Sequence, residues 1–572
     1  MGLIVVQKLF PLFLKARGYT SSYLSLINQS GNRQLQNIDQ MAALLEQIRL
    51  SQQKIVIMPD FDCDGVTSGS LGFAGLSQLG FNVQLYIPHP EQGYGIKVTD
   101  IQRVLQNVPD VKWLITCDVG QTCFDAFTYA YLHGLKVLVT DHHEPILSRK
   151  KLLTECVVNP CQVGETYNKN RPDANFNICG AFVFYQVLLR YTELYQPGQA
   201  SLISLLAVFA GIGTMGDMMP LIQENRLLLK DTLTLIQALR DTPDLKPALT
   251  NVAPPFFKIF NGLKIWLEVL RENDKIFGPI DEKFLSWTLV PMFNSIKRLD
   301  LPMSYIFGIF FNVSPDQQKA FAQRVMAAND YRKVLVKGFM GRIKQDTIDQ
   351  KQPYAPYIFL TDAPGNILGL IANQIIQVTN LPVFVINKRN LAGSGRSLDY
   401  FPVLTYVKHT EFNARGHELA FGINFRDYEQ LDRFNTFVQK IVPQLLTGKK
   451  QKPKYDLHLG VGNTKKITIL TKNNGIDFVQ DAKQLKPYGE GFSEPDLAIG
   501  AFHEQARFMT MGSQKQHLKI ILPGQIELIS WNNAKKLDQV KQANSFVFHG
   551  NLGINHFRGR DTLQMIGDIV TN

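Results

Sequence analysis

The sequence predicts an α/β protein with four parts: a parallel sheet, a helical connector, a smaller α/β unit and a C-terminal β-barrel. In the first 141 residues, apolar strand-like runs alternate with helix-like stretches. From about 180 to 345 the hydrophobic pattern is helical, and after residue 454 only short β-like runs remain. This order of patterns predicts the α/β class and the succession of units.

The composition is that of a folded chain with several domains. It has 572 residues, 45% hydrophobic and 19% charged, which allows several buried cores. Its apolar stretches fall short of the roughly 20 residues that a membrane helix needs, so no membrane partner is expected. The apolar amino terminus lacks a basic n-region and a cleavage site, which indicates an amphipathic mature segment. Six cysteines without a C-x-x-C pair fit buried, reduced thiols, and Cys63 and Cys117 lie in strand-like runs.

Three apolar runs lead directly into aspartates. KIVIMP precedes Asp60, WLITC precedes Asp118 and LKVLVT precedes Asp141. Helix-like stretches at 67–79 and 122–134 separate these runs, which predicts a parallel sheet covered on both faces. Because ligands of such sheets bind outside the carboxyl ends of the strands, we expect an acidic site at that edge.

The rest of the chain is predicted from local signals. Ser314 to Gln317 form a capping box with proline at the first helical position, so a helix should run to about Ile343. Strand and helix patterns return between 355 and 445. The basic segment 447–454 is predicted to be a linker to a barrel of about 110 residues. With 60 Lys and Arg against 49 Asp and Glu, the chain suits a polyanionic partner.

The motif DFDCDG (60–65) places three carboxylates at alternate positions. In extended backbone all three would project to one side and could approach one cation. An Asp-rich turn or a helix cap would contain the same residues. An EF-hand loop is excluded, because its twelfth position needs Glu and is Leu71 here.

Further candidate ligands follow other strands and turns. They are Asp118, the run Asp141-His142-His143, and Asp217 in a glycine-rich turn. For the Asp-His-His run, a structural role and a metal or catalytic role both stay open on the residues alone. As a set, carboxylates with imidazoles suit Mn²⁺ or Mg²⁺. Such a set is typical of phosphodiester hydrolysis by two cations that share a carboxylate. The sequence has no P-loop and no G-x-S-x-G elbow.

An ordered series of motifs extends over nearly the whole chain. It comprises DFDCDG (60–65), IPHPEQGYGI (87–96), TCDVG (116–120), TDHHEP (140–145), VVNP (157–160), NICGAFVFY (177–185), GTMGDMMPLIQENR (213–226), PMFNSIKR (291–298), GSGRS (393–397), RGHELAFG (415–422), HLK (517–519) and NHFRGRDTLQM (555–565). This series resembles the DHH phosphoesterase superfamily and, within it, the RecJ family of single-strand-specific 5′-to-3′ DNA exonucleases.

The resemblance implies five domains. They are an N-terminal segment (1–45), a DHH phosphoesterase domain (46–225), a helical connector (226–344), a DHHA1 domain (345–446) and an OB-type nucleic-acid-binding domain (447–572).

The resemblance also implies the metal and catalytic residues. The family's ligands of two Mn²⁺ or Mg²⁺ ions fall on Asp62, Asp64, Asp118, His142 and Asp217. Asp118 would bridge, Asp64, His142 and Asp217 would complete one site, and Asp62 would serve the other. Three more residues would assist catalysis: Asp60 by ligating or holding water, Asp141 by orienting the adjacent imidazole, and His143 by meeting the scissile phosphate.

The substrate-binding residues implied by the resemblance lie in three regions. A GSGRS loop (Gly393, Ser394, Arg396, Ser397) would hold a 5′-phosphate with backbone N–H groups and a guanidinium, with His417 across the cleft. Asn294 and Arg298 would contact the DNA backbone, as would Lys519, Arg558 and Arg560 of the barrel. On the residues alone, two alternatives remain: the GSGRS loop could be an ordinary flexible turn, and Arg298 could be an arginine on a helix surface. The aromatic residues Tyr488, Phe492, Trp531, His556 and Phe557 could stack on bases, but most, Trp531 included, are expected in the barrel core.

Some positions depart from the family pattern. Met58 stands where many relatives have His, Val119 replaces Asn, Asn373-Gln374 replaces Ser-Arg, Arg415 replaces Gly, and Lys297 replaces Gly. None removes an implied ligand, so these departures bear on metal preference and substrate affinity.

The resemblance implies a metal-dependent exonuclease that hydrolyses single-stranded DNA from its 5′ end to 5′-mononucleotides, in DNA repair and recombination. A cytoplasmic, nucleoid-associated, bacterial or phage-encoded monomer is expected, with a single-strand-binding protein or a helicase as candidate partner. Two alternatives stay open. One is a DHH phosphodiesterase for short oligonucleotides, which would need neither the helical insert nor the barrel. The other is a non-catalytic single-strand-binding DHH protein, in which loss of ligand residues would be expected.

Overall fold

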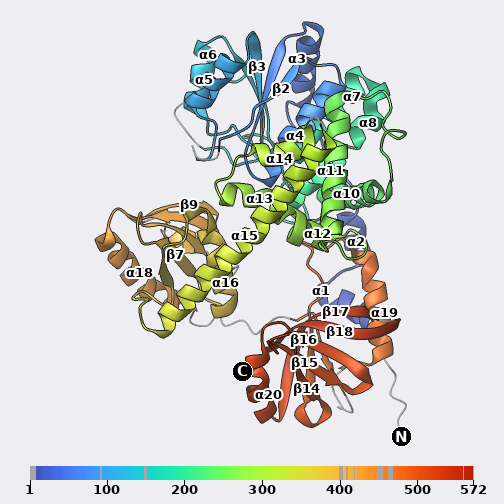
Figure 1. Ribbon diagram of the computed structural model, residues 1–572, viewed down its shortest axis with the longest axis vertical. Helices are drawn as coiled ribbons and strands as arrows, with labels where there is room; N and C mark the ends of the chain where they lie inside the picture. Colours follow the sequence, from blue (N-terminus) through green and yellow to red (C-terminus); the bar gives the residue numbers. More distant parts are fainter. Residues whose placement is uncertain are drawn as a thin grey trace.

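The computed structural model describes residues 8–31, 33–89, 93–146, 151–312, 314–398, 403–407, 410–417, 419–446, 455–461, 468–557 and 559–570. Figure 1 shows a large body (blue to green), a second body (yellow to orange) and a third (red). The long helix α15 (Pro315–Ile348) runs from the first body to the second. Among the described helices none alone has the length and hydropathy of a membrane span, although the bent pair 197–204 and 207–216 meets both criteria together.

The first body contains the predicted parallel sheet. Its strand order is β2-β1-β3-β4-β5, with every neighbouring pair parallel. The strands are β1 (Lys54–Pro59), β2 (Val83–Leu85), β3 (Val111–Cys117), β4 (Lys136–Thr140) and β5 (Cys156–Val158). One face packs against α3 (Ile38–Leu50), α4 (Cys63–Gln78) and α7 (Gly180–Tyr195), and the other against α5 (Val98–Asn107) and α6 (Phe124–Leu132). Both faces are covered, which explains why the strands read as continuous apolar runs.

The start of α4 differs from the sequence expectation. The helix begins at Cys63 instead of Thr67, because Asp62 caps it: Asp62 Oδ1 accepts hydrogen bonds from the N–H groups of Asp64 and Gly65, both at 3.1 Å. The expectation of extended backbone through residue 65 is therefore wrong, and so is the placement of Cys63 in a strand. All six cysteines are free, and all but Cys161 are buried.

The connector is helical, as predicted. Two helices of the first body precede it, α8 (Ala200–Ser204) and α9 (Ala207–Gly216). The connector then comprises most of α10 (Gln223–Asp241), α11 (Pro254–Glu272), α12 (Glu282–Phe284), the π-helix η3 (Leu285–Leu289), α13 (Val290–Arg298), α14 (Ser304–Phe311) and most of α15. Ser314 Oγ accepts the N–H of Gln317, which confirms the cap of α15. The helix continues five residues beyond the predicted end at Ile343, and its last turns join the core of the second body.

The second body holds a mixed sheet of order β6-β7-β8-β10-β9. Its elements are β6 (Ile358–Thr361), α16 (Gly365–Thr379), β7 (Val383–Asn387), β8 (Ala392–Arg396), α17 (Val403–Val407), β9 (Asn413–His417), β10 (Ala420–Asn424) and α18 (Tyr428–Leu446). The GSGRS segment, expected as a loop, is mostly strand β8, paired with β7 on one side and β10 on the other. The backbone N–H and C=O groups of this strand pair with its two neighbours in the sheet, so they do not form a cradle of free N–H groups for a phosphate.

The third body is the predicted β-rich unit. Its eight strands follow the order β12-β11-β13-β17-β18-β16-β15-β14. They are β11 (Leu457–Gly460), β12 (Thr468–Ile469), β13 (Leu497–Phe502), β14 (Arg507–Met511), β15 (His517–Leu522), β16 (Ile526–Ser530), β17 (Ser545–Phe557) and β18 (Arg560–Val570), with the helices α19 (Lys472–Ala482) and α20 (Leu537–Gln542). The expected linker 447–454 lies outside the described residues.

The third body is anchored to the first by charged side chains. Arg226 of α10 is buried, and its guanidinium donates to the carbonyls of Leu485, Lys486 and Pro487 at 2.6–3.1 Å. Arg17, at the end of α1 (Leu9–Arg17), pairs with Asp456 through two bonds of 2.6 and 2.7 Å. Figure 1 shows α1 beside α19 of the third body and α2 (Ser21–Ile27) below α10. The N-terminal segment thus ties two bodies together.

Three expected domain boundaries fall inside helices. The limits at 45, 225 and 344 lie within α3, α10 and α15. Because a continuous helix is one structural element, we propose that the units divide at the ends of these helices.

We expect Arg226→Met to lower the free energy of unfolding by about 3 kcal/mol, because it leaves three buried carbonyls without a donor. Chemical denaturation of the full chain measures this. Arg240→Met, near the end of the same helix, is the control: its guanidinium contacts Asp241 and the Gly278 carbonyl at the surface, so stability should change by less than about 0.5 kcal/mol. Equal effects of the two substitutions would contradict the anchoring role of Arg226.

Candidate functional site

The strand ends of the first sheet bring the predicted carboxylates together. Asp60 follows β1, Asp118 follows β3 and Asp141 follows β4, as the sequence predicts. Asp118 adopts φ 62°, a left-handed conformation uncommon for residues with a side chain. Its N–H donates to Thr140 O at 3.0 Å, which fixes the turn beside the neighbouring strand.

Asp64 is held from the opposite side by the start of α7. The N–H groups of Gly180 and Ala181 donate to its two carboxylate oxygens at 2.6 and 3.0 Å. A Cβ at Gly180 would lie 2.6 Å from that of Asp118, so only glycine lets α7 approach this closely. The amino end of a helix also favours a negative charge. Burial of Asp64 therefore depends on this contact.

The acidic side chains form two groups that share Asp118. Asp60, Asp62 and Asp118 offer oxygen atoms within 4.8 Å of one another. Asp64, Asp118, His142 and Asp217 do the same, with His142 Nε2 lying 3.0 Å from Asp217 and 3.2 Å from Asp118. The sequence argument that Asp60, Asp62 and Asp64 approach one cation is wrong, because the helical turn at Cys63 directs Asp64 into the other group.

The electrostatics of the two groups favour bound cations. Burial, together with the charge of Asp62, raises the pKa of Asp60 to about 8. Burial and Asp217 raise the pKa of Asp64 to about 6, and burial holds that of Asp118 well above its ordinary range. Asp118 Oδ1 is buried and accepts no hydrogen bond from the described residues. Carboxylates so placed ionise together only beside cations, so this donor set fits two hard divalent metal ions.

His143 and Asp141 form a pair at the edge of this site. Asp141 Oδ1 lies 2.8 Å from His143 Nδ1, and it also accepts the N–H groups of His142 and His143. The imidazole that Asp141 orients is therefore that of His143. Burial opposes a charge on this ring, but the hydrogen bond to Asp141 raises the pKa of His143 above its ordinary value. Its side chain is 36% exposed, so a ligand can reach it.

Asn294 and Arg298 of α13 lie beside the acidic groups. Asn294 Oδ1 accepts the N–H of Cys63 at 3.0 Å, which fixes the loop between β1 and α4. Burial and the charges of Arg332 and Arg396 lower the pKa of Arg298 to about 10, whereas the negative charge of Asp62 raises it. Arg298 is thus coupled to two other guanidinium groups and to one carboxylate of the acidic site.

Arg332 and Asn373 were not predicted as site residues. Arg332, on α15, is oriented by Asn329, whose Oδ1 accepts its Nε and Nη2 at 3.2 and 2.9 Å. Asn373 Oδ1 accepts Arg396 Nε at 2.8 Å. The first contact joins residues three apart on one helix, and the second joins α16 to β8 within the second body. What the sequence does not indicate is that Arg332 and Arg396 lie near Arg298 of the connector, because that depends on how the bodies pack.

The other predicted substrate residues are not gathered at the acidic site by any described contact. Arg396 also donates to Ser394 Oγ at 2.8 Å, and the glycines of β8 leave room for neighbours, Gly393 for Ile386 and Gly395 for Phe421. Ser397 is buried at the end of β8.

In the third body, Lys519 pairs with Glu527 at 2.5 Å and Arg560 is exposed. Arg558 and the side chains of His417 and Phe557 lie outside the described residues. Tyr488 and Phe492 are buried and stack on each other, and His556 pairs with Asp561. Trp531 is 50% exposed, so its expected place in the core is wrong: it follows β16 in a turn and packs edge-on against His517.

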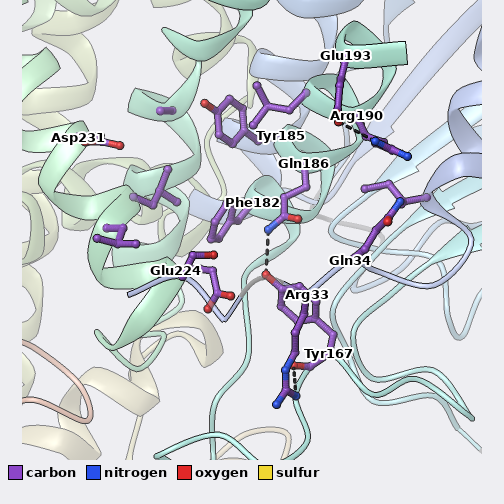
Figure 2. A pocket seen from close by; sticks show the side chains of 16 residues that line it. Arg33, Gln34, Tyr167, Phe182, Tyr185, Gln186, Arg190, Glu193, Glu224 and Asp231 are labelled. Atoms are coloured by element: carbon purple, nitrogen blue, oxygen red, sulfur yellow. Dashed lines mark hydrogen bonds and ion pairs between the residues drawn. The ribbon is translucent and has the colours of Figure 1, made fainter. Parts of the chain in front are cut away.

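A separate hollow of about 560 Å³ lies between α7, α10 and the chain before α3 (Figure 2). Gln186 donates to the Tyr167 hydroxyl, and Arg190 pairs with Glu193. None of the predicted ligands or phosphate-binding residues lines it.

Comparison with known proteins finds two matched domains and several similar proteins. The model described as "DHH family, N-terminal domain" matches residues 54–212, and the model described as "RecJ OB domain" matches residues 469–568. The Single-stranded-DNA-specific exonuclease RecJ of Haemophilus influenzae is 26% identical over 94% of this chain and 91% of that protein.

This chain resembles RecJ proteins over nearly its whole length.

Some of the RecJ proteins that it resembles are longer. RecJ of Bacillus subtilis is 24% identical, and the match covers 93% of this chain but 63% of that protein. RecJ of Thermus thermophilus, solved in complex with Mn²⁺, has a TM-score of 0.72 at 22% identity, over 98% of this chain and 75% of that one. A structure of the same protein with Mg²⁺ gives 0.68 at 20% identity. At this level of identity the structural likeness establishes the fold.

We expect two Mn²⁺ ions per chain in a calorimetric titration, and Asp118→Asn to weaken both because the two groups share Asp118. Saturating Mn²⁺ should stabilise the wild type by about 5 kcal/mol, which is about 2.7 kcal/mol for each of two sites, when its concentration is about 100-fold above the Kd of both sites. Without metal, Asp118→Asn should be more stable than the wild type, since it removes one of several repelling carboxylates.

Asp110→Asn is the matched control for Asp118→Asn. Asp110 is exposed and has φ 62°, a conformation that asparagine tolerates. The Asp110→Asn variant should bind Mn²⁺ like the wild type. Full Mn²⁺ binding by Asp118→Asn would contradict the assignment of the shared ligand.

Proposed function

We propose that this chain is a metal-dependent 5′-to-3′ exonuclease that hydrolyses single-stranded DNA to 5′-mononucleotides. The observation that carries the proposal is the pair of acidic groups sharing Asp118, beside a cluster of three arginines: Arg298, Arg332 and Arg396. A phosphodiester substrate needs both parts, cations where the reaction occurs and fixed positive charge for the other phosphates.

The relatives support the substrate and the metal. Those of Haemophilus influenzae, Thermus thermophilus and Bacillus subtilis are each named single-stranded-DNA-specific exonucleases. The Thermus protein has been solved with Mn²⁺ and with Mg²⁺. The third body, matched by a RecJ OB domain, suits a single strand that trails from the site.

The residues of the two acidic groups would hold the metal ions. Asp60, Asp62 and Asp118 would bind one, and Asp64, Asp118, His142 and Asp217 the other. When bound, a pair of divalent cations activates water and neutralises the charge that develops on the phosphoryl group.

The chain's own residues position the substrate. With Nδ1 engaged by Asp141, a protonated His143 can donate from Nε2 to a phosphate oxygen. Asn294 keeps the metal loop in place through its bond to the N–H of Cys63.

The arginine cluster would recognise phosphate groups. Several guanidinium groups close together repel one another unless an anion lies between them. One carboxylate acts on Arg298 and one on Arg332, Asp62 and Asp330 respectively, and among the described residues neither Arg332 nor Arg396 forms an ion pair. Ser394 and Arg396 of β8 would meet the terminal 5′-phosphate with their side chains, together with Ser397 and His417, while Gly393 lets β8 pack in the sheet. Lys519, Arg558 and Arg560 remain proposed contacts for the trailing strand.

The biological context is part of the proposal. We propose a role in DNA repair and recombination, at the nucleoid in the cytoplasm of a bacterium or as a phage-encoded protein, for a monomer. A single-strand-binding protein or a helicase would deliver the strand.

We expect a 5′-phosphorylated, 3′-labelled single strand to be shortened from its 5′ end with Mn²⁺, while EDTA abolishes the reaction. Fully paired duplex should resist digestion. Asp118→Ala should lose at least about 1,000-fold in rate, since both metal groups lose a ligand. Binding without cleavage by the wild type in Mn²⁺ would refute the exonuclease and favour a non-catalytic single-strand binder.

We expect Arg332→Ala to raise KM for a 5′-phosphorylated strand about 10-fold, and to reduce the slope of affinity against salt by about one charge. Lys333→Ala removes the adjacent, exposed cation of the same helix and serves as the control. If both substitutions weaken binding equally, Arg332 has no particular role in phosphate recognition.

A further inference from the structure

One helical stretch connects the acidic site with the third body. It comprises α12, η3 and α13, residues 282–298 without a break. The residues that are not buried include Lys283, Trp287, Pro291, Asn294 and Arg298. Their spacing of 4, 4, 3 and 4 residues places them along one face of the helix.

The carboxyl end of this face contacts the acidic site. Asn294 accepts the N–H of Cys63, in the loop that carries the first carboxylates. Lys297 lies with its ammonium 3.9 Å from the centre of the Phe61 ring. This end of the helix therefore borders the proposed reaction site.

The amino end of the same stretch contacts the third body. Lys283 pairs with Glu494 at 2.8 Å, and Asp281, which caps α12, lies 3.4 Å from Lys486. Figure 1 shows α12 above the third body and α13 further along, toward α15. A DNA single strand that passes from the acidic site to the third body can follow this face.

Trp287 lies between these two ends. Its side chain is 75% exposed, whereas Trp113 and Trp266 are 5% and 0% exposed. It lies on the π-helix η3, which contacts α9, the helix that ends one residue before Asp217. Seven residues separate it from Asn294, about 10 Å along a helix axis. A large exposed ring is thus held on a rigid element close to the site.

The charges of this stretch favour a polyanion over a protein partner with mixed charges. The stretch contains Lys283, Lys297 and Arg298, and its one acidic residue, Glu282, is buried 3.3 Å from Lys486. A face with cations at both ends and an aromatic ring between them is the composition of single-strand binding surfaces, where bases stack and phosphates meet cations.

We propose that Trp287 is a stacking platform for one base of the single strand, on the path between the acidic site and the third body. The proposal rests on the proposed function, because it needs a single strand engaged at the acidic site. It adds a position-specific contact to that function. The contact is independent of base identity, since every base has a π-face.

An abasic scan tests the contact. A 5′-phosphorylated oligonucleotide carries one abasic residue, moved stepwise from the 5′ end, and Kd is measured in EDTA to prevent hydrolysis. We expect wild-type Kd to rise about five-fold or more at one position within the first few nucleotides, the lower end of what one base stack contributes. Trp287→Ala should bind the intact strand with that weakened Kd and show no further loss at that position, while Trp287→Phe should largely restore it.

Tryptophan fluorescence gives a readout that does not depend on the stability of a variant. Wild-type fluorescence should be quenched by the strand, and Trp287→Phe should lose part of that quenching. Of the four tryptophans, only Trp287 and Trp531 are exposed. Trp531→Phe is therefore the control, and it should keep the part of the quenching that comes from Trp287.

The outcomes separate the two proposals. If the wild type digests and binds single strands but Trp287→Ala has unchanged Kd and unchanged quenching, the stacking platform is refuted and the exonuclease stands. If the wild type neither binds nor digests single strands, the proposed function fails and the platform fails with it.

Discussion

The concentration of negative charge at one edge of the first sheet is the constraint on which the site depends. Asp60, Asp62, Asp64, Asp118 and Asp217 converge within two groups, and burial with neighbouring negative charge raises the pKa of Asp60, Asp64 and Asp118. The fold offsets this with local donors: the first N–H groups of α7 for Asp64, and backbone N–H groups of α4 for Asp62. Bound divalent cations would neutralise the remaining negative charge, so metal binding would relieve the repulsion between these carboxylates.

Positive charge is placed next to this acidic edge by a different part of the chain. Arg298 comes from the connector, Arg332 from the long helix α15, and Arg396 from a strand of the second body. Because α15 enters the cores of both bodies, it fixes how the second body faces the first. An anion held by these guanidinium groups would therefore be positioned relative to the metal groups by packing between helices and not by a loop.

The departures from the family pattern are explained in part by their neighbours. Met58 and Val119 belong to one apolar cluster on the α5–α6 side of the sheet, so the two replacements are compatible with each other. Asn373 replaces one residue of a Ser-Arg pair and orients Arg396. Nothing in the described contacts explains Arg415, which is exposed on the edge strand β9.

The sequence by itself determined the parallel sheet, the helical connector, the β-rich C-terminal unit and the aspartates at the strand ends of the first sheet, because strand periodicity, capping residues and strand-end aspartates are local signals. It did not determine that Asp62 caps α4, which divides DFDCDG between two groups, nor that GSGRS forms a strand in mid-sheet. Arg332, Asn373 and Trp287 gained their proposed roles only in the tertiary structure. Each acts through elements far away in the sequence, and the packing that joins those elements leaves no regular spacing to detect.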